Sequence, residues 1–424
     1  MTPADRRSTY AWLLSALIFA ASVMNYMDRA VLGVLMQQVR SELSMSNTDY
    51  GIAVNMFLCA YAVFYILGGR LADRFGYRRT IALSLTFWSL TGMAHAFVRG
   101  LGSLCLVRGL LGVGEGSFYP AAIRGITEWF PSEQRAKAIG LLLAGLSVGS
   151  LLTPPLAAWI SIQYGWRVAF LVIGAAGFLL LPAWSALHRS MDRAHSVGER
   201  SLQPCAAATA ELAVPLRFVL VNRKYWSAVF ARALSDSAWY FYLFWMPGYF
   251  QAVRGFDAAM VGKYLWLPYL AACGGALGGA WAASALMSHG VSMDKARKAV
   301  LLASAAGSAV GALAFLPGAA AAVMLVCLGL FAHTSYATNI HTVITDISPP
   351  AHTAVLYGIS GATGTVMGAL SQPVIGWIVD LRGYTPAFLA AGSCYILAAV
   401  LLLAGVGRIE RITAPGVAVG APRS

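Results

Sequence analysis

The chain has 424 residues, of which 58% are hydrophobic and only 11% are charged. Soluble domains carry about 25% charged residues, so this composition excludes a soluble globular protein and indicates one that crosses a membrane several times. The net charge of +13 does not indicate a nucleic-acid partner, because the basic residues lie in short loops between apolar runs. The six cysteines show no CxxC or CxxH spacing, so we expect neither a disulfide framework nor a metal site, and no cofactor.

Twelve apolar runs follow one another, and each is long enough for a membrane-crossing helix. The first continues past Asp28 without a clear cleavage site, so we interpret it as a retained span and not as a signal peptide. Residues 189–224 are too polar for lipid. These features predict an all-α polytopic membrane protein with an N-terminal six-helix bundle (1–188), a cytoplasmic linker (189–224) and a C-terminal six-helix bundle (225–424). The runs lie at roughly 11–37, 48–70, 79–98, 101–128, 136–160, 167–188, 225–251, 258–287, 298–317, 319–346, 352–379 and 384–408.

Basic residues are concentrated in the loops on one side of these runs. That side holds the linker and a set of loop residues: Arg70, Arg74, Arg78, Arg79, Lys295, Arg297 and Lys298. Cytoplasmic loops carry an excess of lysine and arginine, so we expect the linker and both termini in the cytoplasm. The expected location is the cell's inner (plasma) membrane.

The fourth run contains two charged residues, Arg108 and Glu115. They are seven residues apart, which is two helical turns, so both side chains point the same way. A charge at the centre of a membrane helix costs roughly 2.5–3.5 kcal/mol, so such residues are kept by a partner or by a function. The run ends in EWFPSEQRAK, a charged turn in which Pro131 stops the helix.

Three of the seventeen acidic residues are expected inside the membrane, namely Asp28, Glu115 and Asp236. Counting depth along the first and fourth runs puts Glu115 near the midplane, with Asp28, Arg29 and Arg108 somewhat to the outer side. A guanidinium group suits a carboxylate ligand, and a buried carboxyl suits a proton. The cluster therefore indicates a proton site beside an anion site, and the alternative is a buried structural ion pair.

Weaker candidates lie in the second half of the chain. Asp236 follows Arg232 by four residues and could pair with it on one helix face. Trp239 could stack on a sugar ring or serve only in packing. Asn339 in the tenth run could contact a ligand. The histidines on either side of it are expected to be satisfied by neighbouring helices: His333 and His341.

The loop after the second run, GGRLADRFGYRRT, resembles the loop signature of the major facilitator superfamily. The matching residues are Gly69, Asp73, Arg74, Gly76, Arg78 and Arg79. A weaker copy, GGAWAASALMSHGVSMDKARK, follows the eighth run but has no aspartate where Asp73 would repeat. The resemblance implies two parallel six-helix repeats that work by alternating access. The sequence shows no nucleophile–base pair or metal-ligand spacing, so we do not expect an enzyme.

Four further stretches are similar to the anion:cation symporter family of this superfamily: NYMDR, RGLLGVGEGSFYPAAI, EWFPSEQRA and YGWRVAF. Within that family, DSAWYFYLFWMPGYF and YGISGATGTVMGALSQPVIGWIVD resemble the hexuronate transporter branch. The resemblance implies that Asp28 and Glu115 are the proton-coupling carboxyls and that Arg29 and Arg108 belong to the same network. It also implies that two tyrosines face the substrate: Tyr26 and Tyr61.

Two positions depart from the family pattern. Ser147 stands where members often carry an amide, and Cys273 stands where hexuronate-type members tend to carry an acid. Both fit a smaller or less hydroxylated substrate as well as they fit a hexuronate.

We therefore predict a proton-coupled symporter of an organic anion, a sugar acid such as a hexuronate or an aldonate, that acts as a monomer in the lipid bilayer. The alternatives are an exchanger of organic phosphates, an importer of aromatic or dicarboxylic acids, and a transporter-like anion sensor.

Overall fold

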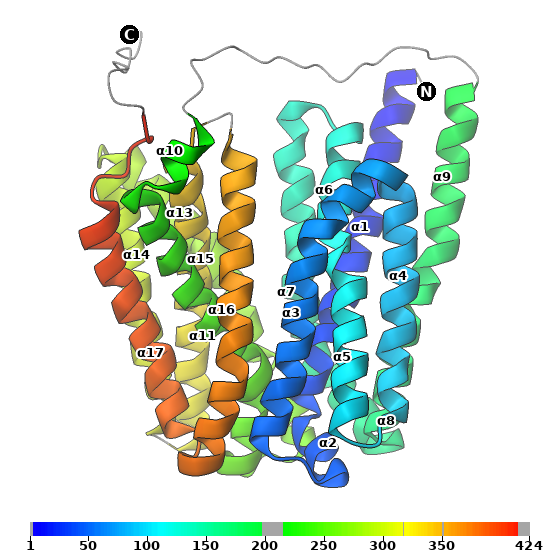
Figure 1. Cartoon of the computed structure of the whole chain (residues 1–424), viewed down its shortest axis with the longest axis vertical. Helices are drawn as coiled ribbons and strands as arrows, with labels where there is room; N and C mark the ends of the chain where they lie inside the picture. The colour runs from blue at the N-terminus through cyan, green and yellow to red at the C-terminus, as the bar shows by residue number, and fades with distance from the viewer. Residues whose placement is uncertain (1–2, 197–214, 317, 350–351, 414–424) are drawn as a thin grey trace. The chain divides into compact units, whose positions relative to one another are not determined.

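The computed structural model describes residues 3–196, 215–316, 318–349 and 352–413, and within these ranges the chain is helical and has no strand (Figure 1). The expected linker falls partly outside, because residues 197–214 are not among those described. Every apolar run expected from the sequence is occupied by a helix or by two successive helices. Among the described residues, eight helical stretches are long and apolar enough on their own to cross a membrane.

The first six runs form α1 (Pro3–Val34), α3 (Asn47–Phe75), α4 (Tyr77–Ala94), α5–α6 (Leu101–Gly116 and Phe118–Trp129), α7 (Ser132–Tyr164) and α8–α9 (Trp166–Ala176 and Leu180–Ser196). The last six form α11 (Arg223–Arg254), α12–α13 (Ala258–Tyr264 and Leu267–Ser288), α14 (Met293–Gly311), α15 (Ala319–Ile347), α16 (Thr353–Arg382) and α17 (Thr385–Val400). The short elements are α2 (Met36–Leu43), α10 (Leu216–Leu220), three 3₁₀ turns at His95–Phe97, Gly177–Leu179 and Ala312–Phe315, and a final π-helical turn at Leu401–Val406.

From its apolar sequence we expected the fourth run to be one continuous helix. The structure instead contains two successive helices. The run divides at Ser117, which ends α5 and begins α6. Glycines follow one another closely before this point, at Gly112, Gly114 and Gly116, and glycine weakens a helix by about 1 kcal/mol relative to alanine. Pro131 then stands between α6 and α7, as predicted.

The structure divides into two compact units that do not follow chain order. Unit 1 holds residues 1–206, 241–270 and 369–384, and unit 2 holds residues 207–240, 271–368 and 385–424. The division into two sequence-contiguous halves around 189–224 describes the expected repeats and stays a prediction.

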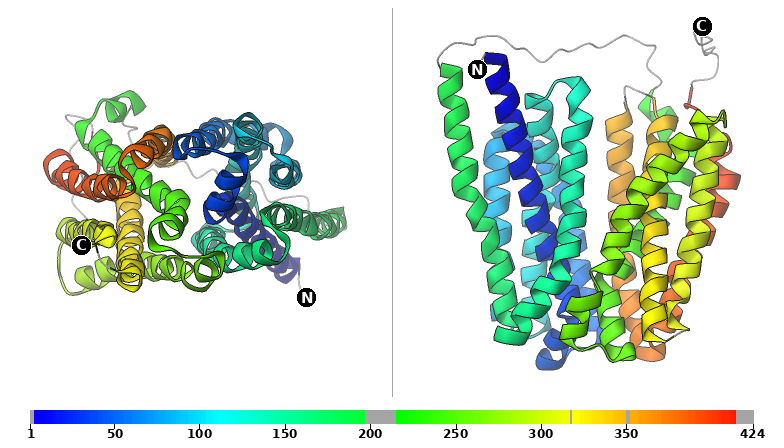
Figure 2. Two further views of the ribbon diagram at one scale, coloured as in Figure 1. Left: turned by 90° about the horizontal axis from the view of Figure 1, so that it is seen from below. Right: turned by 180° about the vertical axis from the view of Figure 1, so that it is seen from behind.

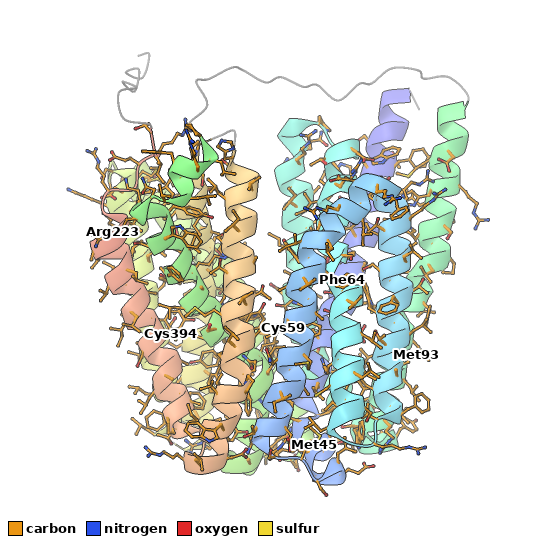
Figure 3. All side chains as sticks on the ribbon, viewed as in Figure 1. Met45, Cys59, Phe64, Met93, Arg223 and Cys394 are labelled. Carbon is orange, nitrogen blue, oxygen red and sulfur yellow. The ribbon has the colours of Figure 1, made fainter. Side chains whose placement is uncertain are left out.

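Unit 1 is packed through glycines. In this unit α3 lies along α5, α1 lies along α7, and α4 contacts both α5 and α8 (Figure 2). A Cβ on Gly112 would clash with the Phe57 carbonyl oxygen, and one on Gly116 would lie 2.7 Å from the Tyr61 carbonyl oxygen and 2.9 Å from Cβ of Phe64. Figure 3 labels Phe64, which lies on α3. Glycine on α5 therefore lets its backbone meet the backbone of α3.

The later segments of unit 1 also pack on α3. The Tyr50 hydroxyl donates to the Phe244 carbonyl oxygen at 2.8 Å. The Asp380 carboxylate accepts hydrogen bonds at 2.7–2.9 Å from the backbone and side chains of Asn47 and Thr48, the first two residues of α3. This carboxylate satisfies two amide groups that a helix leaves free at its N-terminus.

Unit 2 is built around α15. Here α14 packs on α15 and α17. A Cβ on Gly279 would lie 2.7 Å from Cα of Ser335, and one on Gly311 would clash with Gly329, so small residues bring α13 and α14 close to α15.

Candidate substrate and proton site

Arg29 and Glu115 form a buried ion pair between α1 and α5. Arg29 Nη2 donates to Glu115 Oε2 at 2.8 Å, and Nε donates to the same oxygen at 3.1 Å. The side chains are 4% and 0% exposed. The other carboxylate oxygen, Glu115 Oε1, is buried without a hydrogen-bond partner. The ion pair therefore gives hydrogen bonds to only one of the two carboxylate oxygens of Glu115.

Aromatic rings surround the Arg29 guanidinium. Its central carbon lies 4.5 Å from the ring centroid of Tyr61, 4.9 Å from that of Tyr26 and 5.3 Å from that of Phe57. Such contacts stabilise a desolvated cation by about 2 kcal/mol. The two tyrosines expected to face a substrate thus lie against the arginine expected to belong to the same network.

Arg108 and Asp28 are buried nearby but lack full partners. Arg108 is 1% exposed, and its Nε and Nη2 atoms have no hydrogen-bond partner. Asp28 is 2% exposed, and its Oδ2 atom has none. The two charges interact electrostatically with each other and with Glu115. The structure therefore brings the four predicted charged residues together, and it identifies Arg29 as the direct partner of Glu115.

Helix geometry separates the roles of Asp28 and Arg29, although they are neighbours in sequence. Consecutive helical residues point about 100° apart. Arg29 faces α5, whereas Asp28 faces α4, because a Cβ on Gly92 would lie 2.9 Å from Asp28 Oδ1. The same added atom would lie 3.2 Å from Cα of Gly174 on α8, so a larger residue at position 92 would displace this carboxylate.

Sequence reasoning missed two polar residues beside this cluster. His95 is 1% exposed, stacks on Phe170 with ring centroids 5.0 Å apart, and interacts electrostatically with Arg108. Asn25 is fully buried and accepts from Arg29 Nη2 at 3.5 Å. Asn25 lies one helical turn before Arg29, and that spacing could have identified it.

Unit 2 holds the remaining two predicted substrate contacts. Trp239 stacks on His333, with ring centroids 5.1 Å apart and planes 11° apart. The amide nitrogen of Asn339 donates to the carbonyl oxygens of Gly279 and Ser335 at 3.1 and 3.0 Å, so it ties α13 to α15. His333 bonds the Tyr395 hydroxyl at 2.6 Å, in agreement with the expectation that a neighbouring helix satisfies it.

The loop motif between α3 and α4 is held by ion pairs. Asp73 pairs with Arg124 of α6, and Arg78 binds both oxygens of Asp192 at 2.6 and 2.8 Å. Gly76 has φ +78°, a conformation that favours glycine.

The other members of the motif are less constrained. Arg74 and Arg79 are exposed. A Cβ on Gly69 would meet nothing within 4 Å, and the close approach is instead made by its neighbour Gly68, against Ser117.

A helical chain that buries paired charges in its membrane-crossing segments, with a basic loop after the second segment, has the features expected of a membrane transporter. The family profile of the Major Facilitator Superfamily matches residues 18–289. The chain belongs to this superfamily, which confirms the predicted fold of twelve membrane helices in two bundles and makes the protein a multi-pass transporter and not an enzyme.

The chain is similar over nearly its whole length to three Escherichia coli (strain K12) proteins. It is 30% identical to a "Probable L-galactonate transporter" (89% of this chain, 84% of that one), 26% identical to a "Hexuronate transporter" (92% and 93%) and 28% identical to a probable galactarate/D-glucarate transporter (95% and 96%). These names match the hexuronate branch that the motifs indicated.

Two solved structures share the fold. One is a bacterial homologue of the human lysosomal transporter Spinster, with TM-score 0.73, 18% identity and coverage of 94% of this chain and 95% of that one. The other is the D-xylose-proton symporter, with TM-score 0.72, 17% identity and coverage of 95% and 99%.

Proposed function

We propose that the protein is a proton-coupled symporter of a sugar acid, a hexuronate or an aldonate, in the inner membrane, with both termini in the cytoplasm. The observation that carries the proposal is the cluster in unit 1. Two arginines and two carboxyl groups are buried together in membrane-crossing helices, and Arg108, Asp28 and Glu115 each keep polar atoms without a hydrogen-bond partner. The relatives named as sugar-acid transporters support the choice of substrate.

Buried charges of this kind are costly unless they are paired, so unsatisfied ones indicate a use. A guanidinium group binds a carboxylate through two parallel hydrogen bonds. When the substrate carboxylate reaches Arg29 or Arg108, Glu115 or Asp28 loses its cationic partner. A buried carboxylate without such a partner is stabilised by taking up a proton. Anion and proton then occupy the site together, and neither is stable there alone.

The test is uptake into proteoliposomes with wild-type protein and Glu115→Gln. Glutamine fixes the neutral state, so we expect accumulation of glucuronate or galactonate driven by a pH gradient to fall to the level of empty liposomes. Exchange of labelled for unlabelled substrate, which needs no net proton movement, should persist and shows that the variant is folded. Glu128→Gln, at an exposed position on α6, is the matched control and should accumulate substrate like wild type.

Three results would contradict the proposal. Accumulation by Glu115→Gln that a protonophore abolishes as in wild type would remove Glu115 from the coupling step. Stronger stabilisation of the purified protein by neutral sugars than by their acids, in a thermal-shift assay, would exclude an anion site. Stronger stabilisation by sugar phosphates would favour an exchanger of organic phosphates.

A further inference from the structure

Unit 2 contains a second buried guanidinium group outside the site described above. Arg232 of α11 is 8% exposed. Its Nη1 atom donates to the Ser360 hydroxyl at 2.6 Å, and its central carbon lies 4.9 Å from the ring centroid of Tyr357. The predicted pairing with Asp236 is present, with 3.4 Å between Arg232 Nε and Asp236 Oδ2, but Nε makes no hydrogen bond. One edge of the guanidinium is thus fixed by α16, and the other is held only loosely.

Two glycines of α16 leave room for this pair. A Cβ on Gly361 would lie 3.3 Å from Arg232 Nη2, and a Cβ on Gly364 would clash with Asp236 Oδ2. Both glycines belong to the stretch YGISGATG, which is similar to the hexuronate transporter branch. Glycine at both positions lets α16 approach α11 closely, and it leaves no side chain between the α16 backbone and the Arg232–Asp236 pair.

Two further polar atoms point to a ligand. The Tyr336 hydroxyl is on a fully buried side chain, lies within electrostatic range of Asp236, and has no hydrogen-bond partner. His341 Nδ1 is bonded to the Tyr357 hydroxyl at 3.3 Å, which leaves His341 Nε2 buried and also without a partner. A buried polar group without a hydrogen bond destabilises the folded protein by about 1–3 kcal/mol. A ligand that bonds these two atoms would remove that cost.

We propose that Arg232, Tyr336 and His341 form a subsite for a carboxylate group of the transported acid, and that Asp236 is the counter-ion this carboxylate replaces. The proposal rests on the function proposed above, since the ligand is the same organic acid. A guanidinium edge, a phenolic hydroxyl and an imidazole nitrogen can each hydrogen-bond a carboxylate, and Arg232 supplies the charge. Asp236 balances that charge when no substrate is present, so the buried arginine is never left alone.

The experiment measures binding of galactonate, with one carboxylate, and galactarate, with two, to the purified full-length protein by thermal shift and titration. Tyr336→Phe is the decisive variant, because the lost hydroxyl bonds nothing in the ligand-free protein. We expect its melting temperature without ligand to stay at the wild-type value and its affinity to fall about tenfold or more. Arg232→Lys keeps the positive charge but loses the planar guanidinium group, which can make two parallel hydrogen bonds. It should weaken binding at least as much.

Tyr384→Phe is the matched control. Its hydroxyl is likewise buried without a hydrogen-bond partner, but it lies beside Tyr249 and belongs neither to the Arg232 group nor to the cluster around Arg29 and Arg108, so affinity should not change. A loss of affinity for either acid in Tyr336→Phe and Arg232→Lys, with the control unchanged, supports the subsite. Wild-type affinity for both acids in Tyr336→Phe and Arg232→Lys overturns the subsite alone. Failure of the wild type to bind any sugar acid overturns the proposed function as well.

Discussion

At the scale of single residues, the charges of unit 1 are not equivalent. Arg29 is paired and enclosed by aromatic rings, whereas Arg108 keeps two nitrogen atoms without hydrogen bonds. Arg29 is therefore suited to hold Glu115 in the ligand-free state, and Arg108 is the group with free capacity for an incoming carboxylate. This division of roles could not be predicted from sequence, because both arginines have the same charge and the same helical context.

Arg108→Lys tests that division. Lysine keeps the charge but loses the planar fork, and a hydrogen bond to a charged group contributes about 1.5–3 kcal/mol. We expect substrate uptake to fall by about tenfold to a hundredfold in initial-rate assays. Arg99→Lys, at an exposed position before α5, should behave like wild type. Near-normal uptake by Arg108→Lys would show that this arginine is only a structural counter-ion.

At the scale of elements, the glycines of α5 explain why a charged helix can be packed so tightly. Gly112 and Gly116 meet the backbone of α3, and Gly114 meets Trp88 of α4, with 2.9 Å from the added Cβ to Cβ of Trp88. With these faces occupied by α3 and α4, the remaining direction carries Glu115 to Arg29 of α1. The positions of the glycines in RGLLGVGEG thus determine which neighbouring helix the Glu115 side chain faces.

Gly112→Ala should destabilise the protein, although alanine is the better helix former. Its Cβ would clash with the Phe57 carbonyl oxygen and lie 2.9 Å from the Tyr61 nitrogen, and backbone atoms cannot move aside as a flexible side chain can. Overpacking costs about 1–3 kcal/mol, more than the gain in helix propensity of about 1 kcal/mol. The melting temperature in detergent should fall.

Gly109→Ala is the control on the same helix, because nothing lies within 4 Å of its added Cβ. It should be neutral or slightly stabilising. Equal melting temperatures for Gly109→Ala and Gly112→Ala would show that α3 and α5 are not held by backbone contact.

At the scale of the whole molecule, two carboxylates beyond the predicted apolar runs bind the first residues of other helices. Burial opposes the charge on Asp380, but its hydrogen bonds from Thr48 and Asn47 outweigh that effect and lower the pKa of this carboxyl. Hydrogen bonds from Trp166 and Arg167, the first two residues of α8, lower the pKa of Glu42. Both groups are therefore more stable as anions in the folded protein than in the unfolded chain.

Asp380→Asn should lower the melting temperature, and the loss should depend on pH. Because the folded-state pKa is lowered, the stabilisation is complete above the ordinary aspartate pKa of about 3.9 and disappears as the pH falls through the folded-state value. We expect the difference from wild type to be largest at pH 6–7 and to shrink below about pH 4, as measured by thermal melts in detergent. A difference that is independent of pH would assign the effect to lost hydrogen bonds and not to charge.

Sequence alone predicted the helices and the members of the charged cluster, because both depend on local patterns: apolar runs, helical spacing and rare intramembrane charges. It did not predict the break at Ser117, the different directions of Asp28 and Arg29, or the polar groups around Arg232. These depend on which glycine faces which helix. The hydrogen bond that Asn47 donates to Asp380 joins residues 333 positions apart, and no local pattern indicates it.

That bond also sets an order of events during biosynthesis. Unit 1 is assembled from three stretches of chain, the last of which ends at residue 384. While the ribosome is still making the middle of the protein, the first turn of α3 has its amide groups exposed and its partner does not yet exist. The unit that carries the arginine–glutamate pair can insert early, but its last stabilising contacts form only when α16 has been made, so its maturation is tied to completion of nearly the whole chain.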